Sequence, residues 1–174
     1  MFVAAMCRSD IWRADNFVVY SDDCGLSWHV SQRAFEGGDE AKVVELPDGR
    51  VLMSVRQNGA RGYAFSDDGG ETWRGQGHWE EMQTNACNGE MLLVDSFIGQ
   101  NNVLLHSLPN SMQREDVSLF VSRDGGVTWP ESHLIMPGPS AYSSMTLLKD
   151  GTIGMFVEKL VDGKTELWWM VIRQ

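Results

Sequence analysis

Three copies of one eight-residue pattern recur along the chain and constrain its fold more than any other feature. The pattern is S-x-D-x-G-x-[ST]-W, and its copies are Ser21–Trp28, Ser66–Trp73 and Ser122–Trp129. They begin 45 and 56 positions apart, a spacing typical of one four-stranded propeller blade per repeat. In each copy the Asp can bond to its own turn, the Gly can adopt a positive φ, and the Trp can pack on a neighbouring sheet. The repeat therefore predicts an all-β propeller.

The segments between these copies have the pattern of short antiparallel strand pairs. Two pairs are joined by Asp-Gly turns, at Asp48-Gly49 and Asp150-Gly151, and this dipeptide between apolar runs is a strong hairpin signal. A third pair has a longer connection. The predicted pairs are 42–46 with 50–56, 91–94 with 103–108, and 144–148 with 152–158.

Length and composition favour one globular domain over residues 1–174. A chain of 174 residues can bury roughly 70% of its unfolded surface, and 43% hydrophobic residues with seven Trp exclude a disordered chain. No Pro-rich linker or change in composition marks an internal boundary. The first apolar run is too short for a signal peptide, and no stretch approaches the ~20 apolar residues of a membrane span. These features leave the cellular compartment open.

The charge and the cysteines exclude several classes of function. A formal net charge of −10 disfavours nucleic acid and anionic membranes as partners, although a local cluster of Arg could still bind a small anion. Cys7, Cys24 and Cys87 are odd in number and lack CxxC spacing. We therefore expect buried free thiols instead of disulfides or a zinc site.

Aligning the two Asp-Gly hairpins brings four polar residues into matching places. Glu40 and Tyr142 each lie nine residues before the turn glycine, whereas Arg56 and Glu158 each lie seven residues after it. The first strand of a propeller blade lines the central axis. We therefore expect Glu40 and Tyr142 to approach each other at one mouth of the axis, with Arg56 and Glu158 close by.

The ordered series Glu40, Arg56, Arg114, Tyr142 and Glu158 resembles the exo-α-sialidases (neuraminidases), which are six-bladed propellers with Asp boxes. The resemblance runs over nearly the whole chain and includes the segments 39–56, 111–116, 138–143 and 156–158. It implies that Tyr142 is a nucleophile, that Glu40 is its general base, and that Arg56 and Arg114 bind the substrate carboxylate. Glu158 would support the residues that contact the substrate without contacting it itself, and the chemistry would need neither metal nor cofactor.

This chemistry is physically reasonable for a sialoside. Sialic acid carries a carboxylate on the carbon under attack, so a carboxylate nucleophile would be repelled, whereas a phenol is neutral until a neighbouring base accepts its proton. The planar guanidinium of Arg binds a carboxylate through two parallel hydrogen bonds, a geometry that Lys cannot reproduce.

The chain also departs from the family pattern. The family has a third Arg near the N-terminus and an acid/base Asp on an early loop, and neither has a counterpart in this sequence. The three copies of the eight-residue pattern, which are Asp boxes, account for about three to three and a half blades. A six-bladed propeller needs nearly twice this length. We therefore expect a C-terminal half of the catalytic propeller, without the N-terminal blades, which self-associates to complete the ring.

Three hypotheses for the function follow. The first is a sialidase-family glycoside hydrolase that removes terminal sialic acid from glycoconjugates. The second is a sialic-acid or glycan-binding module without catalysis. The third is an Asp-box propeller that serves protein interaction, in which the boxes are scaffold and Arg56 binds no sialoside.

Overall fold

The computed structural model describes residues 1–8 and 14–173, except for the side chains of residues 5–8. The described residues form β-strands and turns, and none of them forms an α-helix. The strands are β1 (Phe2–Arg8), β2 (Ala14–Tyr20), β3 (His29–Val30), β4 (Phe35–Glu36), β5 (Ala41–Glu45), β6 (Val51–Val55), β7 (Asn58–Ser66), β8 (Arg74–Asn85), β9 (Glu90–Phe97), β10 (Gln100–Pro109), β11 (Glu115–Ser122), β12 (Glu131–Leu147), β13 (Ile153–Val161) and β14 (Lys164–Ile172). The predicted all-β class is confirmed. The described part of the chain has no helix long and apolar enough to cross a membrane.

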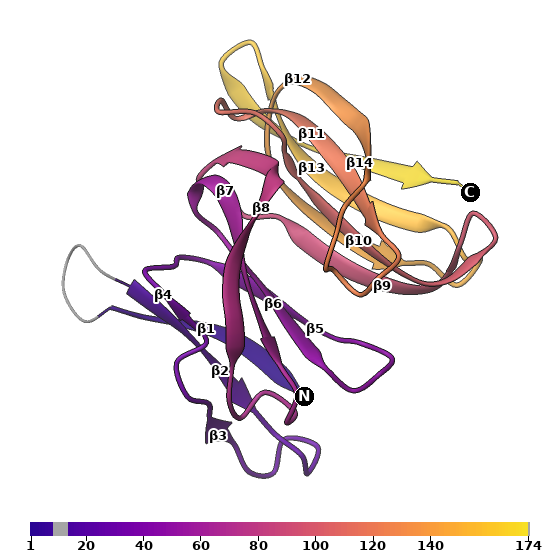
Figure 1. Cartoon of the computed structure of the whole chain (residues 1–174). Coiled ribbons are helices and arrows are strands. Elements are labelled where there is room, and N and C mark those ends of the chain that lie inside the picture. The colour runs from indigo at the N-terminus through magenta and orange to yellow at the C-terminus, as the bar shows by residue number, and fades with distance from the viewer. Residues whose placement is uncertain (9–13, 174) are drawn as a thin grey trace.

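The strands pair antiparallel into three sheets that correspond to four successive blades. Blade I holds β1 to β4, and blade II follows the order β5-β6-β7-β8. The third sheet has six strands, β9 to β14, because β12 belongs to two blades. Its first part pairs with β11 in blade III, and its second part pairs with β13 in blade IV. Figure 1 shows the blades following one another from indigo to yellow.

A corner at Pro137-Gly138-Pro139 lets β12 pass from blade III to blade IV. The register with β11 shifts before and across this corner, and the register with β13 shifts after it. Gly138 has a φ of 72°, which favours glycine. The sequence predicted the strand at 144–148 but not its continuity with the strand that precedes the corner.

Each interface between neighbouring blades has its own hydrophobic core. Between blades I and II the core is centred on Val18, Phe35 and Met53. The core between blades II and III contains four buried aromatic residues, whereas the one between blades III and IV is built from aliphatic side chains, Met and one aromatic residue, Phe97. Alternate side chains of a strand point to opposite faces, so one blade contributes to the cores on both of its sides.

The three Asp boxes form the same turn. In the second box, Asp68 accepts hydrogen bonds from the backbone N of Thr72 at 2.9 Å, from its Oγ1 at 2.5 Å, and from Ser66 Oγ at 2.8 Å. Asp23 and Asp124 make the equivalent bonds in the other two boxes. The predicted role of the Asp is thus confirmed, whereas the predicted burial of the Trp varies. Trp129 is buried, but Trp28 is 42% exposed.

The cysteine prediction was right for one of the two thiols whose side chains are described. Cys87 is buried and free, whereas Cys24 is free but exposed, because it lies in the turn of the first Asp box. The side chain of Cys7 lies outside the described residues.

Neighbouring blades meet along their first strands. Lys42 of β5 pairs with Glu90 of β9 at 3.1 Å, and Ser144 of β12 donates to the same Glu90 oxygen at 3.3 Å. The three residues hold the same register position in their blades, opposite Ser54, Ser107 and Phe156. This row fixes the relative height of the first strands and hence of the residues at their entries.

Candidate active site

The register of the two Asp-Gly hairpins brings the four aligned residues to the same end of their blades. Ala41 pairs with Val55 in blade II, and Ser143 pairs with Val157 in blade IV. Glu40 and Arg56 lie one step beyond the first pair, and the backbone N of Arg56 donates to the carbonyl of Glu40 at 2.8 Å. Tyr142 and Glu158 lie one step beyond the second pair. The sequence alignment of these hairpins is therefore a structural equivalence.

The guanidinium of Arg56 lies between Glu40 and Tyr142. Its Nη1 donates to Glu40 Oε2 at 2.5 Å and to the Tyr142 hydroxyl at 2.9 Å. Its Nε lies 3.5 Å from Asp39 Oδ2. Glu40 and Tyr142 do converge as expected, and Arg56 joins them from a position between the two.

The surroundings of Arg56 strengthen its positive charge. The side chain is only 16% exposed, and this burial acts to lower its pKa. The hydrogen bond to Glu40 and the charges around the guanidinium outweigh that effect, so the pKa of Arg56 is raised above its ordinary value. Arg56 therefore stays cationic, as binding of an anion would require.

Arg114 also lies close to the ring of Tyr142. It directly precedes β11, and its Cζ lies 5.3 Å from the centre of the Tyr142 ring, whereas Arg56 Cζ lies 6.0 Å from it. Arg114 Nη2 donates to the carbonyl of Ala86 at 3.2 Å, and the Arg114 carbonyl accepts from the backbone N of Ser140 at 3.0 Å. Two guanidinium groups therefore lie near one phenol, and Arg114 is the exposed one.

Glu158 lies behind Tyr142 and lines a small cavity. Its Oε2 accepts from the backbone N of Tyr142 at 3.4 Å. The cavity beside it has a volume of about 180 Å³. It is lined by Arg114, Ser140, Ala141, Glu158, Lys159, Leu160 and Thr165. All five predicted site residues thus lie in one connected group.

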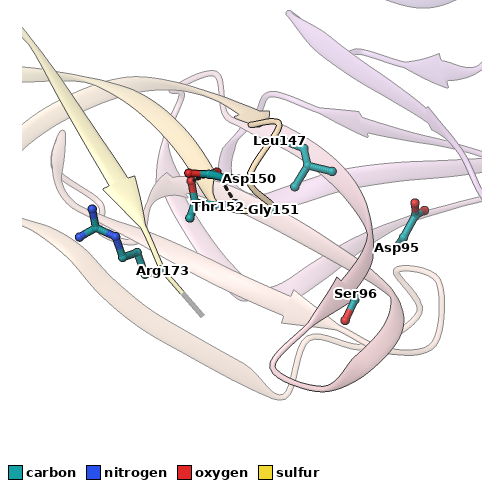
Figure 2. A pocket seen from close by; sticks show the side chains of 7 residues that line it. All are labelled: Asp95, Ser96, Leu147, Asp150, Gly151, Thr152 and Arg173. Atoms are coloured by element: carbon teal, nitrogen blue, oxygen red, sulfur yellow. Dashed lines mark hydrogen bonds between the residues drawn. The ribbon is translucent and has the colours of Figure 1, made fainter.

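A larger hollow of about 550 Å³ lies elsewhere and contains none of these residues. Figure 2 shows its lining, with Asp150 and Thr152 in the hairpin turn, Asp95 and Ser96 on β9, and Arg173 after β14. Hydrogen bonds from Thr152, assisted by the charge of Arg173, lower the pKa of Asp150. The hollow lies at the turn end of the hairpin, whereas Tyr142 and Glu158 lie at its opposite end.

Sequence reasoning missed two residues beside the site. Asp39 pairs with Arg56, but the equivalent position in blade IV is Ala141, so the repeat gave no signal for it. Arg61 is completely buried on β7 and bonds to Ser54 Oγ at 2.8 Å. An Arg inside a strand pattern usually lies at the surface, and only the packed structure reveals this one. The described residues include no group of three His, Cys, Asp or Glu that could hold a metal ion.

Comparison with known proteins matches this architecture. The family model for the BNR repeat-like domain covers residues 2–155. The chain belongs to the BNR repeat-like domain family. This BNR domain is homologous to sialidases. It is 36% identical over 148 residues to a sialidase of Micromonospora viridifaciens, an alignment that spans 80% of the chain and 23% of that relative.

Solved structures match in the same way. The Hadza microbial sialidase Hz136 has a TM-score of 0.79 at 29% identity, over 89% of this chain and 32% of that one. A Trypanosoma rangeli sialidase solved with sialic acid has a TM-score of 0.72 at 22% identity, over 90% of this chain and 27% of that one. The BNR domain therefore has the fold of sialidase propellers and spans about a quarter to a third of the length of these relatives.

Proposed function

We propose that this chain carries the nucleophile and part of the carboxylate-binding site of a sialidase that removes terminal sialic acid. The observation that carries the proposal is the position of Arg56, whose Nη1 donates to both Glu40 and Tyr142. Homology to sialidases supports the substrate class, and the complex of the Trypanosoma rangeli enzyme shows that one such propeller binds sialic acid.

The proposed chemistry gives a role to four of the five site residues. Arg56 and Arg114 bind the sialic acid carboxylate beside Tyr142. The Tyr142 oxygen attacks the anomeric carbon, its proton passes to Glu40, and the bond to the leaving oxygen breaks. That oxygen needs a proton as it leaves, and none of the five site residues is assigned to this step. A water molecule then attacks the anomeric carbon, the bond to the Tyr142 oxygen breaks, and Tyr142 regains its proton from Glu40.

The decisive experiment measures fluorophore release from an aryl α-sialoside, with Tyr142→Phe beside the native chain. We expect Tyr142→Phe to reduce turnover at least about a thousandfold, as loss of a nucleophile does. Its affinity for free sialic acid should fall by less than about tenfold, because it loses one hydrogen bond worth about 0.5–1.5 kcal/mol. Equal turnover by both proteins would exclude Tyr142 as the nucleophile.

A second candidate function is binding of sialic acid without turnover. It is favoured by a site in which two guanidinium groups are in place while no residue is assigned to protonate the leaving oxygen. Calorimetry with sialic acid would then show saturable binding and no product, and Arg56→Ala should weaken it about 10- to 100-fold because charged hydrogen bonds are lost. Arg123→Ala, which removes an exposed arginine paired with Glu131, is the control. Unchanged binding in Arg56→Ala would favour a role in protein interaction.

The cavity beside Glu158 gives a further test of the proposed site. A carboxylate that lines a cavity of about 180 Å³ next to Arg114 is suited to a small planar cation. We expect millimolar guanidinium to increase sialic acid affinity in the native chain but not in Glu158→Gln, relative to sodium at equal ionic strength. An equal effect in both proteins would show that the cation acts elsewhere.

A further inference from the structure

Arg61 is a buried cation, and its hydrogen-bond partners among the described residues are neutral. Its exposure is 0%, and it donates through Nε to Ser54 Oγ at 2.8 Å, through Nη1 to the Cys87 carbonyl at 2.9 Å, and through Nη2 to Asn88 Oδ1 at 3.4 Å. Burial lowers the pKa of Arg61 to about 10, which still leaves it charged at neutral pH. Burying this charge costs free energy that its hydrogen bonds must offset, so these bonds constrain the groups that accept them.

Two of these groups belong to the segment that leads from blade II into blade III. Ala86, Cys87 and Asn88 lie between β8 and β9, and Ala86 has a φ of 35°, which is rare for a residue with a side chain. Since Glu90 holds the register position of Lys42 and Ser144, Asn88 holds that of Glu40 and Tyr142. The segment is therefore part of the same mouth as the site residues.

The same segment supports Arg114. The Ala86 carbonyl accepts from Arg114 Nη2 at 3.2 Å. Asn85 donates from its backbone N to the Ser111 carbonyl at 3.1 Å and from Nδ2 to the Met112 carbonyl at 2.8 Å. Arg114 is exposed, so packing alone does not fix its side chain, and these contacts to residues 85–86 orient it over Tyr142.

We propose that Arg61 is a positioning residue: it clamps Cys87 and Asn88 from beneath, and through the adjoining Ala86 carbonyl it holds Arg114 against Tyr142. Only the ligand measurement below rests on the proposed function. The position of Arg114 is a property of the free protein and can be measured without any ligand.

The first test is the ring-current shift of the Arg114 side-chain protons, measured by NMR. In the native chain these protons should be shifted, because the guanidinium lies 5.3 Å from the Tyr142 ring. Arg61→Met should move them at least halfway to their unstructured values, and Arg61→Lys should fall between the two because it keeps the charge and can reach one acceptor. Arg50→Met, which changes an arginine at the turn end of the same blade, should leave them unmoved.

Cys87 offers a second readout within the clamped segment. The thiol is buried, and burial raises its pKa to about 11 against the opposing charges of Arg114, Arg56 and Arg61. Alkylation by iodoacetamide, followed by peptide mass spectrometry, should be at least about tenfold faster in Arg61→Met than in the native chain or Arg50→Met. Cys24, which is exposed, is the internal reference and should react equally in all of them.

A folded Arg61→Met with native Arg114 shifts and a native Cys87 alkylation rate would overturn the proposal. If Arg61→Met does not fold, Arg61→Lys decides in the same way. Where the native chain binds sialic acid, Arg61→Met should weaken binding at least fivefold, but not in an Arg114→Ala background. Failure of the native chain to bind would contradict the proposed function, and the NMR and alkylation results would still decide the role of Arg61.

Discussion

At the residue scale, the first Asp box carries a backbone conformation that its residue does not favour. Cys24 has a φ of 62°, whereas the equivalent residues of the other boxes are Gly69 and Gly125, with φ values of 69° and 72°. A residue with a Cβ pays about 1–2 kcal/mol for this left-handed conformation. The box turn therefore demands glycine here, and the exposed Cys24 is tolerated at a cost.

Cys24→Gly should stabilise the protein. Because glycine also gains freedom in the unfolded chain, we expect a net gain of about 0.5–1 kcal/mol, which raises Tm by about 1–4 °C in a domain of this size. The matched control is Gly69→Ala, where an added Cβ would meet no atom within 4 Å, so its expected loss of stability reports the backbone alone. Thermal unfolding followed by circular dichroism compares them, and a lower Tm for Cys24→Gly would refute the assignment of strain.

The sequence predicted which residues meet at the site but not how they bond. Equal offsets from Gly49 and Gly151 were sufficient to place Glu40 with Tyr142, because hairpin register is fixed by the turn. The bridging role of Arg56 depends on a side-chain conformation that no spacing encodes. Arg61 was missed because its burial depends on contacts with Cys87 and Asn88, which the sequence pattern of its own strand does not reveal.

At the element scale, the three Asp boxes form the same turn, but their Trp side chains differ in hydrogen bonding and packing. Trp28 and Trp73 donate from Nε1 to the glycine carbonyl of their own box, at 3.1 and 3.0 Å. In the third box, Trp79 of the preceding blade donates to the Gly126 carbonyl at 2.9 Å instead. Trp129 packs against Trp79 with ring centres 5.3 Å apart. The repeat pattern predicted the turn correctly because its contacts are local, but the packing of each Trp depends on the blade beside it.

The Asp boxes also predict how stability depends on pH. Hydrogen bonds from Ser27, followed by that from Ser21, lower the pKa of Asp23 to about 2, and Thr72 has the same effect on Asp68. A carboxyl group whose pKa is lowered in the folded state stabilises the protein above its unfolded value of about 4. This contribution is lost as the pH falls from about 4 to about 2.

We therefore expect Asp23→Asn to reduce stability at pH 7 and to flatten its decline between pH 4 and pH 2. Urea unfolding followed by Trp fluorescence across this range measures both effects. The control is Asp22→Asn, which changes the neighbouring carboxylate outside the turn bonds. A decline of equal slope in Asp23→Asn and the native chain would exclude the box as its source.

At the scale of the whole molecule, the last blade presents an apolar face. Residues 153, 155 and 157 of β13 point into the core shared with blade III. On the opposite face Phe156 stands across from Trp169 with ring centres 4.7 Å apart, and Leu167 and Val171 lie on the same face of β14. All four are exposed, Leu167 by 66%. Contiguous apolar faces of this kind mark surfaces for association, and β14 adds an unpaired edge.

We expect the chain to self-associate through this face, with blade IV of one copy packed against another copy. Light scattering should give a mass that rises with concentration, and Leu167→Lys with Val171→Lys should lower it by placing charge on the edge strand. Asp162→Lys, in the turn between β13 and β14, is the control for added charge.

Glu158 and Leu160 lie on the same face as Phe156 and line the cavity beside Arg114, so association should also alter anion binding at the site. A native chain that stays monomeric across a wide range of concentrations would contradict this view, and ligand affinity independent of association would separate the face from the site.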